Sequence, residues 1–67
     1  MKLSSAILRY RAYEDISQAE FAARVKLDRT TILRAERDEK ISRLSKAKIE
    51  VVLRERGLDQ YESIEEE

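Results

Sequence analysis

The side chains best suited to recognition chemistry in this sequence are three arginines in one short segment, Arg29, Arg34 and Arg37. On a helix they share an outward side with Thr30 and Leu33. A guanidinium group can bond to both O6 and N7 of guanine, and a threonine methyl group or a leucine side chain can contact the methyl group of thymine. These five residues are therefore the candidates for reading base edges in the major groove of DNA. A solvated helix face is the alternative interpretation of the same arginines.

A second group of side chains could hold the DNA backbone. Gln18 stands at the start of a predicted helix, where its amide and the free backbone N–H groups could hold a phosphate. Lys40 and Arg43 flank the start of a later predicted helix and are also candidates for phosphate contacts. The alternatives are an exposed first-turn residue for Gln18 and an ordinary polar connector for Lys40 and Arg43.

The missing residue types exclude most other chemistry. The sequence has no Cys and no His, which removes disulfide frameworks, thiol nucleophiles, the usual zinc ligand sets and the commonest general base. Without a glycine-rich phosphate loop, no spacing forms a catalytic set. We therefore expect no enzyme activity, metal, cofactor or small-molecule ligand. No apolar run approaches the ~20 residues of a membrane span and the first residues lack a signal-peptide core, so we expect a cytoplasmic protein without a membrane partner.

Charge divides the chain into two parts. The 14 basic and 14 acidic residues cancel formally, but all of the basic residues fall within residues 1–58. Residues 59–67 hold five acids and no base. The sequence therefore predicts a basic body over residues 1–58, which is the candidate DNA-binding domain, and an acidic C-terminal tail over residues 59–67; solvated helix faces are the alternative explanation of the charges. A basic body of this kind is compatible with a polyanionic partner.

The elements that must position these side chains are short helices. A chain of 67 residues holds one small domain, and 42% hydrophobic residues with no Pro and one Gly favour an all-α fold. Ser4 or Ser5 is expected to cap a first helix that runs to about residue 13. The last predicted helix is capped by Ser42, continues to Arg56 and stops at Gly57.

Two further helices are expected in the middle of the chain. Ser17 and Glu20 have the spacing of a capping box, which predicts a helix over residues 18–25. Asp28 is a good cap for a second helix over residues 29–37. Only about three residues remain for the connection between these helices, and this layout is typical of a helix-turn-helix.

The segment 16–37, ISQAEFAARVKLDRTTILRAER, resembles the helix-turn-helix of the lambda-repressor-like family, which includes phage Cro proteins, phage repressors and restriction-modification controller proteins. The matching features are Gln18 at the start of the first motif helix, Ala22 at the contact between the helices, Ile32 inside the second helix and Glu36 at its end. Family members often pair this glutamate with an arginine seven residues before the glutamine, which is Arg11 here. Lys26 stands where the family commonly has glycine, so it is expected to adopt a left-handed backbone conformation.

The resemblance covers about residues 3–53 and implies a compact domain of four to five helices. It also implies a sequence-specific transcriptional regulator that binds double-stranded DNA, above all a repressor, and in a phage or mobile-element operon often the repressor of its own operon. In this interpretation Arg11 and Glu36 form a structural ion pair between the first helix and the recognition helix. The alternative is a small helical module that binds another protein, such as an antitoxin or an antirepressor, which would tolerate substitution of Arg29 and Arg34.

A homodimer is expected because one recognition helix of this size covers only a half-site, so two copies would read an inverted repeat. The last predicted helix also carries more apolar residues than one small core requires. The expected core-facing stripe consists of Leu44, Ala47, Val51 and Val52. The predicted dimer interface consists of Ile49, Val52, Leu53 and Leu58.

Overall fold

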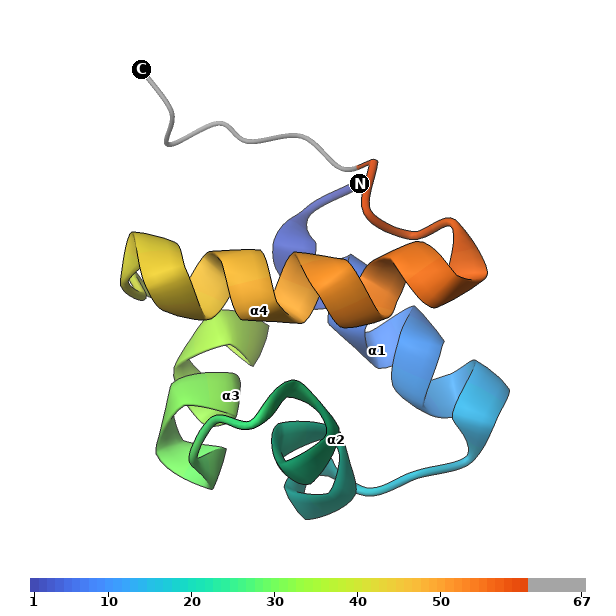
Figure 1. The fold of residues 1–67 in the computed structure, drawn as a ribbon, viewed down its shortest axis with the longest axis horizontal. Helices are drawn as coiled ribbons and strands as arrows, with labels where there is room; N and C mark the ends of the chain where they lie inside the picture. Colours follow the sequence, from blue (N-terminus) through green and yellow to red (C-terminus); the bar gives the residue numbers. More distant parts are fainter. Residues whose placement is uncertain (61–67) are drawn as a thin grey trace.

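Residues 1–60 are the part of the chain that the computed structural model describes, and their regular structure is entirely helical (Figure 1). The helices are α1 (Leu3–Glu14), α2 (Gln18–Val25), α3 (Arg29–Glu36) and α4 (Arg43–Leu53), followed by a 3₁₀ turn, η1 (Arg54–Arg56). The predicted all-α class is confirmed. A fifth α-helix, which the expected four to five allowed, is not present in residues 1–60: after α4 the chain continues as a 3₁₀ turn, which ends at Gly57 with φ 67°.

Three helix starts are stabilised by the capping side chains that the sequence indicates. At the start of α2, Ser17 Oγ accepts a hydrogen bond from the Glu20 N–H at 3.1 Å, and Glu20 Oε1 accepts one from the Ser17 N–H at 2.8 Å. This reciprocal pair completes the predicted capping box. Asp28 at α3 and Ser42 at α4 each accept from the N–H three residues further on, at 2.9 and 3.1 Å. Each contact satisfies an N–H group that the helix itself cannot pair.

Helix α1 begins earlier than predicted. Its first residue is Leu3, and the N-cap residue Lys2 makes no side-chain capping bond. Ser4 is buried inside the first turn, so neither Ser4 nor Ser5 is the cap. Leu3 packs against the core, and this burial stabilises the first turn in place of a side-chain cap.

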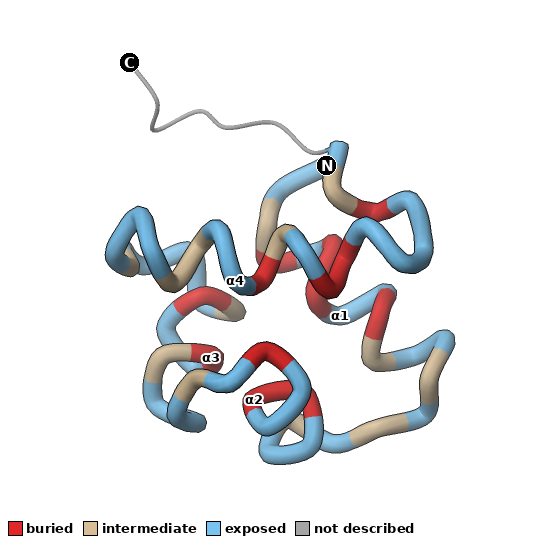
Figure 2. The backbone as a smooth tube through the Cα atoms, in the orientation of Figure 1, coloured by how far each residue is buried: buried red, intermediate tan, exposed pale blue. Residues whose placement is uncertain are grey.

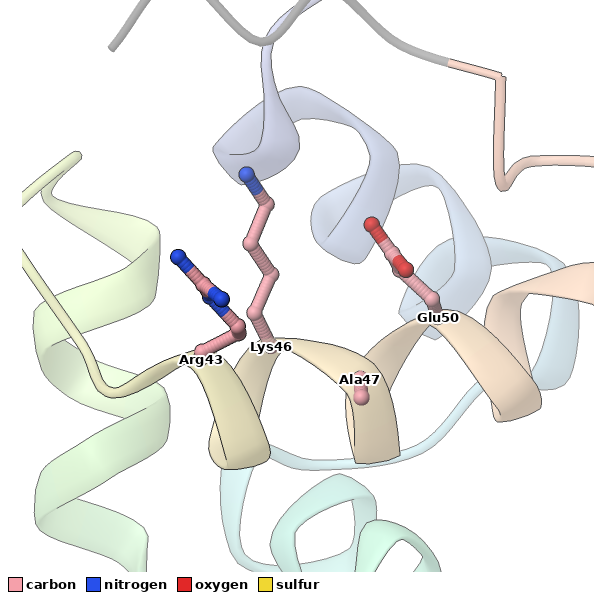
Figure 3. A pocket seen from close by; sticks show the side chains of 4 residues that line it. All are labelled: Arg43, Lys46, Ala47 and Glu50. Carbon is pink, nitrogen blue, oxygen red and sulfur yellow. The ribbon is translucent and has the colours of Figure 1, made fainter. Parts of the chain in front are cut away.

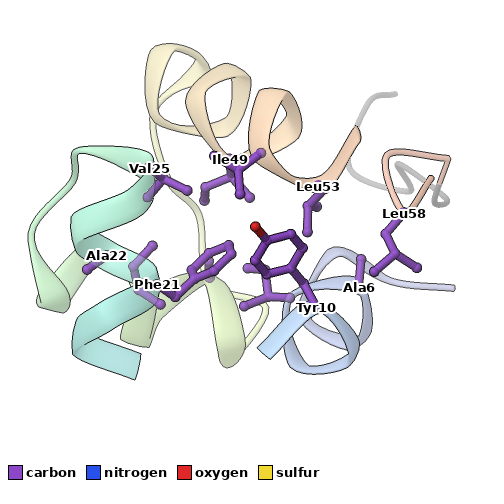
Figure 4. Packing of buried hydrophobic residues seen from close by; sticks show 12 residues of the cluster. Ala6, Tyr10, Phe21, Ala22, Val25, Ile49, Leu53 and Leu58 are labelled. Atoms are coloured by element: carbon purple, nitrogen blue, oxygen red, sulfur yellow. The ribbon is translucent and has the colours of Figure 1, made fainter. Parts of the chain in front are cut away.

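The hydrophobic core lies where the four helices meet (Figures 2 and 4). Tyr10 of α1 and Phe21 of α2 are fully buried, with their ring centroids 5.4 Å apart in an edge-to-face arrangement. The other large side chains that are fully buried are Ile7, Ile32, Ile49 and Leu53. Since Ile32 belongs to α3, one side of that helix packs in the core and the opposite side lies at the surface.

Helix α4 is rotated relative to the prediction. Leu44 and Val51 were expected to face the core, but their exposed fractions are 67% and 59%, and Ala47 is exposed as well. The residues predicted as a dimer interface are buried within the single chain instead: Ile49 0%, Val52 8%, Leu53 0% and Leu58 7% exposed. That prediction is therefore wrong. The chain turns back after Gly57, where the Leu58 N–H donates to the Leu53 carbonyl at 3.0 Å, and this turn brings Leu58 into the core.

Little of the predicted acidic tail falls within the described residues. Asp59 accepts a hydrogen bond from Arg54 Nε at 3.2 Å. Residues 61–67 of the predicted tail lie outside the described part of the chain. Among residues 1–60, no helix combines the length and the apolar character that crossing a membrane requires.

Candidate nucleic-acid interface

Helix α3 has a buried side and an open side. Ile32 and Ala35 on the inner side are 0% and 1% exposed, so the core fixes the rotation of the helix about its axis. The structure leaves all five predicted base-reading side chains exposed: Arg29, Thr30, Leu33, Arg34 and Arg37. Leu33, at 37% exposed, lies at the border of this surface. We call these five residues the α3 face.

The connection between α2 and α3 is short and well anchored. Lys26 ends α2 with φ 61° and ψ 44°, the left-handed conformation expected for it. The following N–H group, of Leu27, donates to the Ala22 carbonyl at 3.0 Å, and the Leu27 side chain packs against the core. Asp28 then caps α3 directly. With so few residues between the helices, the position of α3 relative to α2 is closely constrained.

A chain of polar contacts leads from α1 to the α3 face. Arg11 Nη1 of α1 donates to Glu36 Oε2 at 2.8 Å, which is the ion pair expected from the sequence. Glu36 Oε1 accepts from Gln18 Nε2 at 2.9 Å, and Gln18 Oε1 accepts from Arg29 Nε at 3.2 Å. We call Arg11, Glu36, Gln18 and Arg29 the α3 polar chain. It links three helices and ends at an exposed arginine.

The contacts of Gln18 differ from the phosphate contact that was predicted for it. The nitrogen of its side-chain amide donates to Glu36, and the oxygen accepts from Arg29. The amide therefore orients Glu36 and Arg29 within the chain. Nothing in the sequence pattern indicates the bond between Gln18 and Arg29, which are eleven residues apart. That contact depends on how α2 and α3 pack together.

The two other predicted backbone-contact residues, Lys40 and Arg43, are exposed. Lys40 lies in the connector after α3, and Arg43 is the first residue of α4. Arg43 also borders a shallow open hollow of ≈ 240 Å³ on α4, together with Lys46, Ala47 and Glu50 (Figure 3). The connector and the first residue of α4 therefore offer one exposed cation each, four and seven residues after the end of α3.

Asp28 is the acidic residue at the other end of α3. Hydrogen bonding from the Thr31 side chain and from the Thr31 N–H lowers the pKa of the Asp28 carboxyl group. The carboxylate is therefore charged at neutral pH and occupied as a cap, next to Arg29. This arrangement favours a structural role for Asp28 over contact with bases.

A second polar network lies away from α3, and the sequence analysis did not identify it. The Tyr10 hydroxyl donates to Glu55 Oε1 at 2.8 Å and accepts from Arg24 Nη1 at 3.1 Å. Glu14 accepts from Arg24 at 3.0 Å and pairs with Arg56 at 2.8 Å. We call these five residues the α1–η1 network. It fastens the turn after α4 to α1 and α2.

The electrostatic shifts in the α1–η1 network follow from its contacts. Hydrogen bonds from Arg24 and then Arg56 lower the pKa of Glu14. Burial raises the pKa of Tyr10, and its bond to Glu55 raises it further. Each charged group in this network contacts an opposite charge or the Tyr10 hydroxyl group of the same chain.

Within residues 1–60 no group of three or more acidic, His or Cys side chains is placed to hold a metal ion. Comparison with protein-family models, with curated proteins and with solved structures found no match for this chain.

Proposed function

We propose that this chain is a sequence-specific transcriptional regulator that binds double-stranded DNA, with α2 and α3 acting as a helix-turn-helix like that of the lambda-repressor-like family. The observation that carries the proposal is the α3 face, where five side chains suited to base recognition lie exposed on a helix whose other side is buried. An α-helix with its side chains is about 10–12 Å in diameter, and the major groove of B-DNA is about 12 Å wide. The helix and the groove therefore match in size.

Each residue of the α3 face has a proposed contact. Arg29, Arg34 and Arg37 donate paired hydrogen bonds to guanine edges, and Thr30 and Leu33 contact thymine methyl groups. Such a pair of bonds contributes about 1–3 kcal/mol of discrimination against the wrong base. Arg29 and Arg34 on α3, with Arg37 at its C-terminal cap, would thus favour a G-containing half-site.

Phosphate contacts would fix the position of α3 in the groove. Lys40, in the connector after α3, and Arg43, at the start of α4, are exposed, and each would neutralise a phosphate. Gln18 contributes indirectly, because its bond to Arg29 restricts the conformations of that arginine before DNA arrives. Restricting a side chain in its bound conformation reduces the entropy cost of binding.

The small size of the module indicates how it would regulate transcription. One half-site offers too few contacts for tight specific binding, so two copies would act together on an inverted repeat. A regulator of this kind acts by occupying its site as its concentration rises, and repression of its own operon is the simplest outcome.

The experiment begins with selection of duplexes from a random library by the wild-type protein. A titration then compares a selected duplex with a scrambled duplex of equal length and composition, at two salt concentrations. We expect the selected duplex to contain an inverted repeat, to bind at least ~10³-fold more tightly than the scrambled one, and to lose affinity steeply as salt rises. Equal binding of both duplexes would overturn the proposal and favour a protein-binding module instead.

A further inference from the structure

The acidic segment 61–67 has no part in the proposed function. Residues 1–60 hold all 14 basic residues of the chain and ten of its acids. The segment adds four acids and no base: Glu62, Glu65, Glu66 and Glu67. An acidic segment attached to a basic body is attracted to the cations within its reach. Which cations these are depends on where the segment is attached.

The attachment point is fixed by the residues just before the segment. Leu58 is 7% exposed and belongs to the same core cluster as Ala6 of α1, and Figure 4 shows these two side chains next to each other. Asp59 pairs with Arg54 at 3.2 Å. The described chain therefore ends near the first turn of α1 (Figure 1).

The connector after α3 comes to the same part of the molecule. Lys2 Nζ lies 4.0 Å from Oδ2 of Asp38, which is two residues after the end of α3. Residues 37–43 around this contact include three exposed basic side chains. The acids of the same stretch are Asp38, which is paired with Lys2, and Glu39. We call the three exposed basic residues of this stretch the connector cations: Arg37, Lys40 and Arg43.

We propose that the acidic segment 61–67 lies against the connector cations and competes there with DNA. Seven residues span up to about 23–25 Å when extended, and the connector cations lie on both sides of the contact between Lys2 and Asp38. The contact itself is independent of the proposed function. Only the competition rests on it, because the connector cations are three of the residues proposed to hold DNA.

The strength of this contact comes from attachment within one chain. Each exposed ion pair contributes little, and salt screens it. Covalent attachment raises the effective concentration of the glutamates near the cations, so that several weak pairs form together. The segment therefore lowers DNA affinity by a modest factor and is displaced when DNA binds.

Arg9 of α1 is the competing cation. It is exposed and lies seven residues after Lys2, which is about 10 Å along a helix. Its exposed neighbours on the outer side of α1 are uncharged: Ser5, Leu8 and Ala12. The connector offers three cations within seven residues, so charge favours the connector over Arg9.

The first arm of the test needs no DNA. It compares the backbone amide shifts of the wild type with those of a neutral-segment variant, which carries Glu62→Gln, Glu65→Gln, Glu66→Gln and Glu67→Gln. We expect shift differences at residues 37–43 as well as within the segment. These differences should vanish at about 1 M salt, where the screening length falls to about 3 Å. Differences confined to residues 58–67, or centred on Arg9, would overturn the proposed contact.

Two matched double variants locate the contact. Lys40→Gln, Arg43→Gln removes one lysine and one arginine from the connector cations, and Arg9→Gln, Lys48→Gln removes the same charge from exposed positions elsewhere. Neutralising the segment should lose most of its effect on residues 37–43 in the first background and keep it in the second. The same response in both backgrounds would mean that only net charge matters, and would overturn the proposed contact.

The second arm titrates a selected duplex with the wild type and with the neutral-segment variant at low salt. Removing the charge of the segment should raise DNA affinity roughly 5-fold, which corresponds to one or two exposed ion pairs. The gain should be smaller in the Lys40→Gln, Arg43→Gln background than in the Arg9→Gln, Lys48→Gln background. Shift differences at residues 37–43 without any gain in DNA affinity would overturn the competition and leave DNA binding intact. If the selected duplex binds no more tightly than a scrambled one, the proposed function fails and the first arm alone decides the contact.

Discussion

The α3 polar chain and the α1–η1 network are built from the same kinds of residues, but they differ in where they end. The first begins at Arg11 inside the molecule and ends at Arg29 on the α3 face. The second is centred on Glu14, which pairs with both Arg24 and Arg56, and the Tyr10 hydroxyl links Arg24 to Glu55. Arg24 and Arg56 each pair with the Glu14 carboxylate, whereas Arg29 bonds the neutral amide of Gln18, so the charge of Arg29 is not balanced by this contact.

The side chains of the α3 polar chain and of the α1–η1 network also differ in how far they are buried. In the α3 polar chain the ion pair of Arg11 and Glu36 has side chains that are only 25% and 10% exposed. In the α1–η1 network the side chains of Arg24 and Arg56 are 42% and 44% exposed. Since exposed ion pairs contribute little and unpaired buried charges cost much, similar residues should have different roles. The α3 polar chain should affect both stability and DNA binding, and the α1–η1 network should affect stability alone.

The largest expected effect comes from removing the arginines of the α3 face. The double variant Arg29→Ala, Arg34→Ala should lose about 2–6 kcal/mol of specific DNA affinity, or roughly 30-fold at least. The matched control is Arg24→Ala, Arg56→Ala, which removes the same charge from the α1–η1 network and should change affinity less than ~10-fold through salt-dependent attraction alone. Titration of a selected duplex checks both. Equal losses would mean that only net charge matters.

The next effect concerns the glutamates at the centre of each network. Glu36→Ala leaves Arg11 without its partner and Gln18 without an acceptor, and should lower the free energy of unfolding by about 2–3 kcal/mol, somewhat below the cost at a fully buried pair. Glu14→Ala frees two exposed arginines and should cost clearly less. Urea denaturation of the two variants makes the comparison. A larger loss for Glu14→Ala would reverse the assignment of roles.

A smaller effect is expected at Gln18. Gln18→Ala removes the acceptor of Arg29 and should reduce specific DNA affinity by about 1 kcal/mol, or roughly 5-fold. The same titration measures this change, with Ala19→Ser on the exposed side of α2 as the control. In the Arg29→Ala background the effect of Gln18→Ala should largely disappear, because the proposed action of Gln18 passes through Arg29. Full additivity would contradict that coupling.

The smallest effect is a pH dependence of the α1–η1 network. Its arginines lower the pKa of Glu14 in the folded chain, so Glu14 stabilises the fold above the ordinary glutamate value of about 4.3. This contribution is lost as the pH falls through the lowered value in the folded state. The stability difference between wild type and Glu14→Gln should therefore be greatest above about pH 5 and shrink as the solution becomes more acidic. Denaturation curves across this range check the trend, and a difference that grew in acid would refute it.

The sequence predicted those features that depend on residues close together in the chain. The helix starts after Ser17, Asp28 and Ser42 were found because capping requires only the residue itself and the next three positions. Gly57 was identified as the end of the last helical segment for a similar local reason. The left-handed conformation of Lys26 was expected from the resemblance, because Lys26 stands where the family commonly has glycine.

The rotation of α4 could not be predicted in the same way. Leu44, Ala47 and Val51 have helical spacing, and so do Ile49, Val52 and Leu53, so the helix is apolar on two sides. Only packing against Tyr10 and Phe21 decides which side is buried. The bond between Gln18 and Arg29 was missed for the same reason, because it forms only when α2 and α3 are in place.

The most direct test of the central claim is a chemical-shift titration of the labelled protein with a selected duplex. The account predicts the largest amide shifts over residues 29–37, with smaller changes at Gln18 and Lys40 and little change along the outer side of α1. Shifts concentrated around Leu8 and Tyr13, with α3 unaffected, would contradict the claim that α3 enters the groove.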